Sequence, residues 1–248
     1  MRARLDMSDP FAEYEALLEQ LERERSGPRR ETGAGKRDSL RWLIARWVIK
    51  FAFAVAVLVL PFYLLVGGSV FFYRQGLPTW PALIAGLLVT ALLLLLYSLW
   101  ITKRLSGRLR VPRHVAKLVV GVVAAYCLYA LVYVSSLNVK DPGLRAEYRA
   151  LHPLLRVATS TLVLVDRDLV ITDMERDLED YERMGLPPYE RSLHLVQADG
   201  FAHAVDLRTL GRRPWRNLLL RGYFMAMGFR TLRHVGTADH LHVSLPMP

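Results

Sequence analysis

Three long runs of apolar residues constrain the fold of this chain more than any other feature of its sequence. They cover residues 51–73, 81–101 and 118–137, and none of them contains Asp, Glu, Lys or Arg. About 20 apolar residues in a helix, rising 1.5 Å per residue, cross the hydrocarbon core of a bilayer. The sequence therefore predicts three transmembrane helices, which excludes a wholly soluble globule.

Basic residues around these runs predict their orientation. Loop 102–117 holds six Lys and Arg residues, whereas loop 74–80 holds only Arg74. Five more basic residues lie close before the first run: Lys36, Arg37, Arg41, Arg46 and Lys50. Because positively charged loops remain in the cytoplasm, the N-terminus is predicted to be cytoplasmic. Three crossings then place everything after residue 137 outside the cytoplasm.

The net charge of +10 belongs almost entirely to the membrane half of the chain. Residues 1–138 contain 18 basic and 9 acidic residues, and residues 139–248 contain 15 and 14. A basic cytoplasmic face attracts the anionic lipids of the bilayer, so no nucleic-acid partner is expected. The single cysteine, Cys127, excludes a disulfide framework and a cysteine-based zinc site.

The chain divides into three predicted regions. Residues 1–39 form a cytoplasmic amphipathic helix, over residues 10–25, and a polar linker; residues 40–138 form the three-span anchor; residues 139–248 form an extracytoplasmic domain. We interpret the N-terminal helix as a docking element for a partner protein or the membrane surface, or as a solvated appendage.

The extracytoplasmic region mixes helical and extended patterns. Its periodicity predicts helices over residues 141–156, 174–184 and 214–227, and strands over residues 161–165, 169–172, 201–207 and 241–245. The first two strands are expected to form a hairpin. Together these elements predict a small α+β domain.

Histidine and aspartate side chains in this region form a candidate metal site. His240 and His242 are two residues apart, so they share one face of an extended strand. Asp206 shares a strand face with two small alanines, which leaves room for a metal, and His194 supplies a further imidazole. Two imidazoles and one carboxylate, with a fourth position open, are the ligands of a catalytic zinc site.

Residues 169–245 resemble the zinc D-Ala-D-Ala carboxypeptidase and dipeptidase family of peptidoglycan peptidases, which shares its fold with the hedgehog signalling domain. The resemblance is carried by residues 169–176 (LVITDMER), 191–194 (RSLH), 204–207 (AVDL), 227–229 (MGF) and 240–243 (HLHV). The family motif S-x-H-x-x-G-x-A-x-D separates its histidine and aspartate by seven positions, whereas His194 and Asp206 are twelve apart. Either the connecting loop is enlarged, which we favour, or His194 is not a ligand and the site has lost its zinc.

The resemblance implies a role for each matching residue. His194, Asp206 and His242 would bind Zn²⁺. His240 would act as general base and then general acid, with Asp239 as the alternative base.

Arg176 would hold the substrate carboxylate or the developing oxyanion; the alternative is a surface ion pair with Asp173 or Asp180. The remaining histidines of this region are interpreted as structural or surface residues: His152, His203 and His234.

The sequence thus predicts a three-span protein of the bacterial cytoplasmic (inner) membrane with a C-terminal α+β zinc-peptidase-like domain. It would act on peptidoglycan stem peptides outside that membrane. Two alternatives remain open: a non-catalytic cell-wall-binding module on the same fold, and a structural subunit of a membrane complex.

Overall fold

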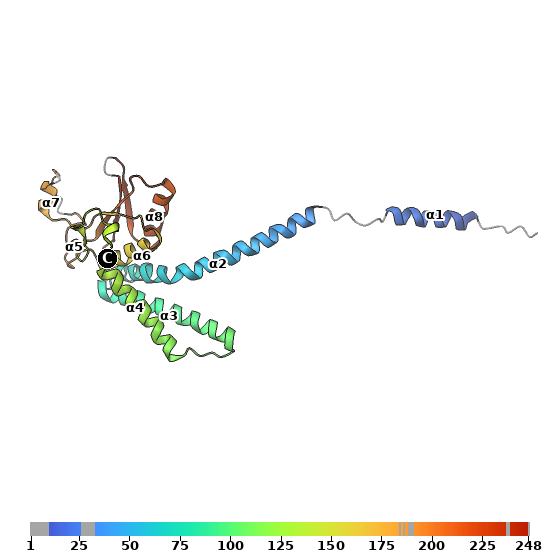
Figure 1. The fold of residues 1–248 in the computed structure, drawn as a ribbon, viewed down its shortest axis with the longest axis horizontal. Helices are drawn as coiled ribbons and strands as arrows, with labels where there is room; N and C mark the ends of the chain where they lie inside the picture. Colours follow the sequence, from blue (N-terminus) through green and yellow to red (C-terminus); the bar gives the residue numbers. More distant parts are fainter. Residues whose placement is uncertain are drawn as a thin grey trace, which may run out of the picture. The chain divides into compact units, whose positions relative to one another are not determined.

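The computed structural model describes residues 10–25, 33–183, 185, 187, 191–236 and 239–247 (Figure 1). Its helices are α1 (Pro10–Arg25), α2 (Gly33–Arg74), α3 (Thr79–Ser106), α4 (Arg113–Val132), the 3-10 helix η1 (Ser136–Asn138), α5 (Leu144–Glu147), α6 (Pro153–Val165), α7 (Leu178–Arg183) and α8 (Pro214–Ala226). Its strands are β1 (Ile171–Asp173), β2 (Ala204–Arg208), β3 (Arg230–His234) and β4 (His240–Ser244). The chain forms two compact units, Met1–Ala56 and Val57–Pro248.

The first unit contains α1 and the beginning of α2. The expected helix over residues 10–25 is present, and its apolar side chains are exposed: Tyr14, Leu17, Leu18 and Leu21. The predicted linker lies partly outside the described residues, and its last part, from Gly33 onward, already belongs to α2.

Among the residues that the structure describes, three helices are long and apolar enough to cross a membrane, as the sequence predicts. They cover Arg41–Arg74 of α2, Thr79–Ser106 and Arg113–Val132. In the second unit, α3 and α4 run side by side after the loop that joins them (Figure 1).

The third of these helices ends at Val132, five residues before the end of its apolar run. Tyr133 is already extended, with φ −122° and ψ 129°. The last turn of a helix leaves its carbonyls without partners. Tyr148 Oη donates to the carbonyl of Ala130 at 2.7 Å, and Arg156 Nη1 donates to that of Leu131 at 2.6 Å. Side chains from the following domain therefore donate hydrogen bonds to carbonyls in the last turn of this helix.

The strands form one four-stranded antiparallel sheet in the order β1-β2-β4-β3. Strands β1, β2 and β4 fall within or next to the expected extended segments, and α8 matches the helix predicted over residues 214–227. Strand β3 was not expected from the sequence, because only one of its five residues is a strongly apolar one.

Two secondary-structure predictions at the start of the domain are wrong. The helix expected over residues 141–156 is interrupted between α5 and α6, because Pro153 disfavours a helical conformation at His152 and instead begins a new helix. The strand expected over residues 161–165 is the end of α6, so there is no hairpin with β1. Burial of α6 outweighs the extended preference of its β-branched residues.

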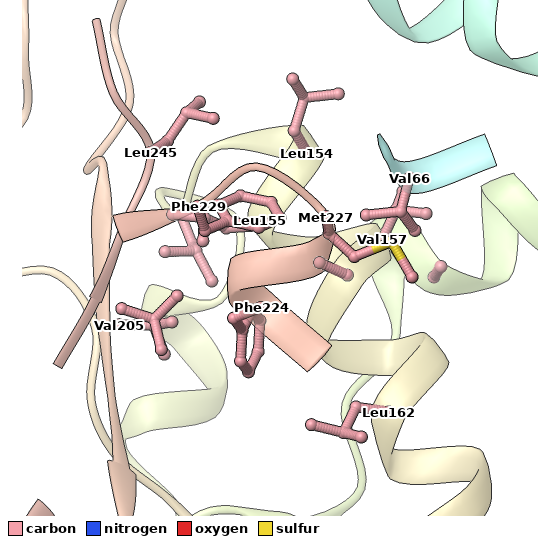
Figure 2. Close-up of a cluster of buried hydrophobic side chains, with 14 of the residues drawn as sticks. Val66, Leu154, Leu155, Val157, Leu162, Val205, Phe224, Met227, Phe229 and Leu245 are labelled. Atoms are coloured by element: carbon pink, nitrogen blue, oxygen red, sulfur yellow. The ribbon is translucent and has the colours of Figure 1, made fainter. Parts of the chain in front are cut away.

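One hydrophobic core joins the apolar helices to the sheet within the second unit. Figure 2 shows Val66 of α2 beside Met227, with Val157 and Leu162 of α6, Phe224 of α8 and Val205 of β2 in the same cluster. Helices α6 and α8 therefore lie between the membrane-type helices and one face of the sheet. The core contains residues on both sides of residue 138, among them Ala130 and Val139.

Candidate metal centre

The register of β2 and β4 places two of the expected metal ligands together. Asp206 and His242 are directly opposite each other, and Arg208 is opposite His240. Directly opposite residues of an antiparallel pair lie on the same face. Val205, Leu207, Leu241 and Val243 occupy the other face and are buried. The face with Asp206 and His242 is thus turned away from α6 and α8.

His194 reaches this face from the loop before β2. Its Nδ1 lies 2.6 Å from the carbonyl oxygen of Met174, and the amide of Arg176 donates to the carbonyl of His194 at 3.0 Å. A carbonyl only accepts, so Nδ1 carries the proton and donates it. The neutral imidazole therefore keeps a lone pair on Nε2, which is the arrangement that second-shell hydrogen bonds impose on metal-binding histidines.

Three potential ligand atoms form a compact triangle. His242 Nδ1 lies 2.9 Å from Asp206 Oδ1, His194 Nε2 lies 3.2 Å from His242 Nδ1, and His194 Nε2 lies 3.4 Å from Asp206 Oδ1. Bonds of 2.0–2.1 Å in a tetrahedral zinc site separate neighbouring ligand atoms by about 3.3 Å. The lone pair of His194 Nε2 faces a carboxylate oxygen, which is favourable only with a cation or proton between them. These residues fit a metal ion.

Asp206 is the centre of a wider set of charges. Its Oδ2 lies 3.2 Å from Arg176 Nη2 and 3.5 Å from His240 Nε2. Burial alone would raise the pKa of Asp206, but the neighbouring imidazoles of His194, His242 and His240 hold it well below its usual range. The carboxylate is therefore ionised and able to bind a cation.

Arg176 lies at the site rather than in an isolated surface pair. Its Nε donates to Asp173 Oδ2 at 2.6 Å, its Nη2 contacts Asp206, and its guanidinium lies 5.7 Å from the ring centre of Tyr181. The expected alternative partner Asp173 is thus present together with Asp206. Asp180 instead pairs with Arg183.

Asp239, the alternative base, points away from the triangle. Its carboxylate accepts hydrogen bonds from Arg233, at 2.8 Å from Nη2, and from the hydroxyl of Thr209. These bonds lower its pKa. His240, unlike Asp239, lies beside Asp206, and the ring of His234 stacks on it at 4.8 Å between ring centres.

A cleft of about 450 Å³ opens beside Asp206 and His240. Arg176 lines it, and five carboxylates form much of its wall: Asp141, Glu147, Asp173, Glu175 and Asp180. Burial, together with the smaller effect of the negative charges of Asp173, Asp180, Glu175 and Asp141, raises the pKa of Glu147 to about 7. The cleft is acidic and large enough for a small ligand.

A second His–Asp cluster lies elsewhere in the domain. His203 Nε2 lies 2.9 Å from Asp199 Oδ2, and His152 Nε2 lies 3.6 Å from the same oxygen and 2.9 Å from Thr79 Oγ1. The amide of Leu154 donates to His152 Nδ1 at 3.2 Å, so Nδ1 carries the lone pair and Nε2 the proton. A protonated Nε2 is no metal ligand. Burial lowers the pKa of His152 to about 2, aided by the charges of His203 and Arg156.

This second cluster was not found from the sequence, which left His152 and His203 as structural or surface residues. Both are almost completely buried. They come from positions 51 residues apart, and Thr79 belongs to the first turn of α3. No local pattern connects them, although Pro153 in the first turn of α6 marks the residue before it, His152, as the N-cap.

Comparison of the chain with protein-family models, with curated proteins and with solved structures gives no match.

Proposed function

We propose that this chain is a zinc-dependent peptidase, anchored in the bacterial cytoplasmic membrane, that cleaves peptidoglycan stem peptides on the outer side. The observation that carries the proposal is the triangle of His194 Nε2, Asp206 Oδ1 and His242 Nδ1 beside a cleft. Two imidazoles and one carboxylate are a catalytic ligand set, because they leave a coordination position open. Zinc in such a site polarises a carbonyl and lowers the pKa of water.

The triangle favours zinc over harder cations. Two of its three donor atoms are imidazole nitrogens, whereas magnesium and calcium prefer sites made of oxygen atoms. The hydrogen bond from His194 Nδ1 to the carbonyl of Met174 fixes the ring so that Nε2 faces the other two donors. This prepares the site for a metal before the metal binds.

His240 is assigned the proton transfers. Its Nε2 is 3.5 Å from Asp206 Oδ2, and both residues line the cleft, so the imidazole lies next to the place where the scissile bond would be held. It would take a proton from the attacking water and give it to the leaving amine. Asp239 is a poorer base because its carboxylate is bound by Arg233 and Thr209.

Arg176 is assigned the binding of a carboxylate or developing oxyanion of the substrate. It lines the cleft, and its guanidinium is already held at Asp173 and Asp206, which leaves it oriented rather than mobile. An oriented guanidinium stabilises negative charge without the cost of ordering a long side chain.

The acidic wall of the cleft indicates the charge of the substrate. Five carboxylates oppose Lys140 and Arg176 there, so a ligand with an ammonium group near the scissile bond is favoured. The orientation predicted from loop charges places the domain outside the cytoplasm, where peptidoglycan peptides with free amino groups are found. We therefore propose an amine-bearing peptide as the substrate.

The test uses the purified full chain in detergent. Elemental analysis is expected to find zinc, and incubation with muropeptides is expected to release a shortened stem peptide. Asp206→Asn should remove both results, and His203→Ala, in the second cluster, should remove neither. A protein that holds zinc but cleaves no muropeptide would favour the cell-wall-binding alternative. A protein that holds no transition metal would contradict the proposal.

A further inference from the structure

Helix α8 leaves one apolar side uncovered. The α8 stripe consists of Trp215, Leu218, Leu219, Gly222, Met225 and Ala226, all of them exposed. The exposed fractions are 56% for Trp215, 70% for Leu218, 63% for Leu219 and 54% for Met225. Single exposed apolar residues are ordinary, but a continuous group on one helix marks an interaction surface.

The stripe has the form of a helix that lies in a membrane interface. At 100° per residue, its six residues cover an arc of about 120°. Arg221 lies just beyond one edge of the arc, and α8 contains no acidic residue. Arg216 lies beyond the other edge and pairs with Asp166 and Asp168. The opposite side, with Leu220 and Phe224, is buried in the domain core. Interfacial helices combine an apolar face with flanking cations, whose long side chains reach the phosphate groups.

The end of α8 contacts the apolar part of α2. A Cβ atom on Gly67 would lie 3.6 Å from Met227 Sδ, and one on Gly228, where φ is +93°, would lie 3.0 Å from Val70 Cγ1. Gly67 precedes Arg74, the charged end of the apolar run, by seven residues, or about 10 Å of helix. The residue after α8 therefore packs against a part of α2 that is long and apolar enough to be within the membrane.

A further exposed apolar residue lies next to the stripe, in a hollow that is also lined by the ion pair of Asp166 and Arg216. Val165, at the end of α6, is 83% exposed, and it lines a shared hollow with Trp215 and Leu219. The stripe thus adjoins Val165 on one side. At the end of α8 it leads to Met227, which packs against α2. The lipid that surrounds α2 would therefore also cover this exposed apolar surface.

We infer that α8 lies in the lipid–water interface, with its stripe in the acyl chains of the leaflet at the Arg74 end of α2. Arg221 would lie at the level of the lipid phosphates. The inference depends on α2 crossing the membrane and is independent of zinc and of peptidase activity. Since the candidate metal centre occupies the sheet face opposite the one packed on α6 and α8, this arrangement turns the centre away from the bilayer.

The test places a fluorescent label on the stripe in the full chain. Cys127, the single cysteine, is replaced by Ala, and Leu218→Cys is labelled with bimane. Leu232→Cys is the matched control, because Leu232 is 58% exposed but lies opposite His242, on the other side of the sheet from α8. Each protein is reconstituted in phosphatidylcholine nanodiscs with plain or brominated acyl chains.

Brominated lipid should quench the label at residue 218 and leave the label at residue 232 unchanged. Met225→Cys gives a second position on the stripe if Leu218→Cys does not fold. Equal fluorescence in the two lipids at both stripe positions would overturn the inference. The inference would also be overturned if the label were shielded from brominated lipid only when two chains share a nanodisc. A second copy of the chain would then cover the stripe.

Discussion

Asp206 on β2 and His242 on β4 are direct partners across the sheet, and His242 Nδ1 lies 2.9 Å from Asp206 Oδ1. Because side chains alternate along a strand, a shift of one residue in this register would turn one of the two into the apolar core. The buried residues on either side of them, Val205, Leu207, Leu241 and Val243, fix that register. The candidate metal centre therefore depends on packing that lies on the other face of the sheet.

Metal retention tests the ligand set. We expect His242→Ala and Asp206→Asn each to lower zinc affinity by more than about 10²-fold, since even second-shell losses cost 10–100-fold. His203→Ala should retain zinc, because His203 bonds to Asp199 instead. Elemental analysis of the purified variants measures the bound metal. Loss of zinc in His203→Ala, with retention in His194→Ala, would show that the ligand assignment is wrong.

Proton transfer separates His240 from His242. His240→Ala should keep zinc bound, while the rate of muropeptide cleavage falls by about 10²–10⁴-fold, the usual contribution of a general acid–base group. His242→Ala should lose zinc and activity together. Zinc content and cleavage rate are measured on the same preparations. Full activity in His240→Ala would indicate that Asp239, and not His240, is the base.

The pH dependence of stability tests Glu147. Its pKa is raised to about 7 in the folded protein, so the folded state disfavours the charged form. Below the unfolded pKa the carboxyl is protonated in both states and costs nothing. As the pH rises from the unfolded pKa toward 7, the free-energy cost of ionising Glu147 in the folded protein develops. Above pH 7 this cost is fully present. Glu147→Gln should therefore stabilise the protein at pH 8 and have little effect at pH 4.

Because Glu147 is only partly buried, water screens much of this cost, and we expect a gain of about 1 kcal/mol. That corresponds to a rise in Tm of about 2–4 °C. Thermal unfolding in detergent at the two pH values measures it, with the exposed Glu179→Gln as the matched control. An equal shift at both pH values would contradict the assigned cause.

The hydrogen bond between Thr79 and His152 links the start of α3 to the start of α6. A double-mutant cycle with Thr79→Val and His152→Ala should give a coupling of about 1 kcal/mol in the free energy of unfolding. His152→Asn should be milder than His152→Ala, because its amide oxygen can accept from the Leu154 amide as Nδ1 does. If the two single effects are simply additive, the bond contributes nothing to stability.

Cysteine labelling tests the orientation. Val235, 80% exposed at the end of β3, and Leu109, in the basic loop after α3, are each replaced by Cys in a Cys127→Ala chain. In spheroplasts a membrane-impermeant thiol reagent should label residue 235 and not residue 109. The reverse pattern would place the domain in the cytoplasm and remove the peptidoglycan substrate from consideration.

Much of the candidate site could be anticipated from local patterns. The spacing of His240 and His242 places them on one strand face whatever the rest of the fold is, and the same alternation separates Asp206 from His203. That His194 lies close to Asp206 was inferred from the family resemblance, in which the spacing between these two residues is irregular. It depends on the loop that ties His194 to Met174 and Arg176, which no periodicity describes.

The elements that were predicted wrongly are those whose environment differs from their local preference. Residues 161–165 are rich in β-branched and apolar types, yet they continue α6, where Thr161 Oγ1 contacts Tyr126 Oη at 2.6 Å. Strand β3 carries little apolar signal and forms because β4 offers its edge. In both cases tertiary contacts outweigh a preference of less than about 1 kcal/mol per residue.

The sequence by itself determined the three apolar helices and the face on which each strand residue lies, because bilayer thickness and strand alternation act on consecutive residues. Only the tertiary structure decided how the parts combine. It joined the apolar helices and the sheet in one core, brought His194 to Asp206 and His242, and paired His152 with Thr79 and Asp199. These contacts join residues far apart in the chain, and their geometry is fixed by close packing, which no local pattern encodes.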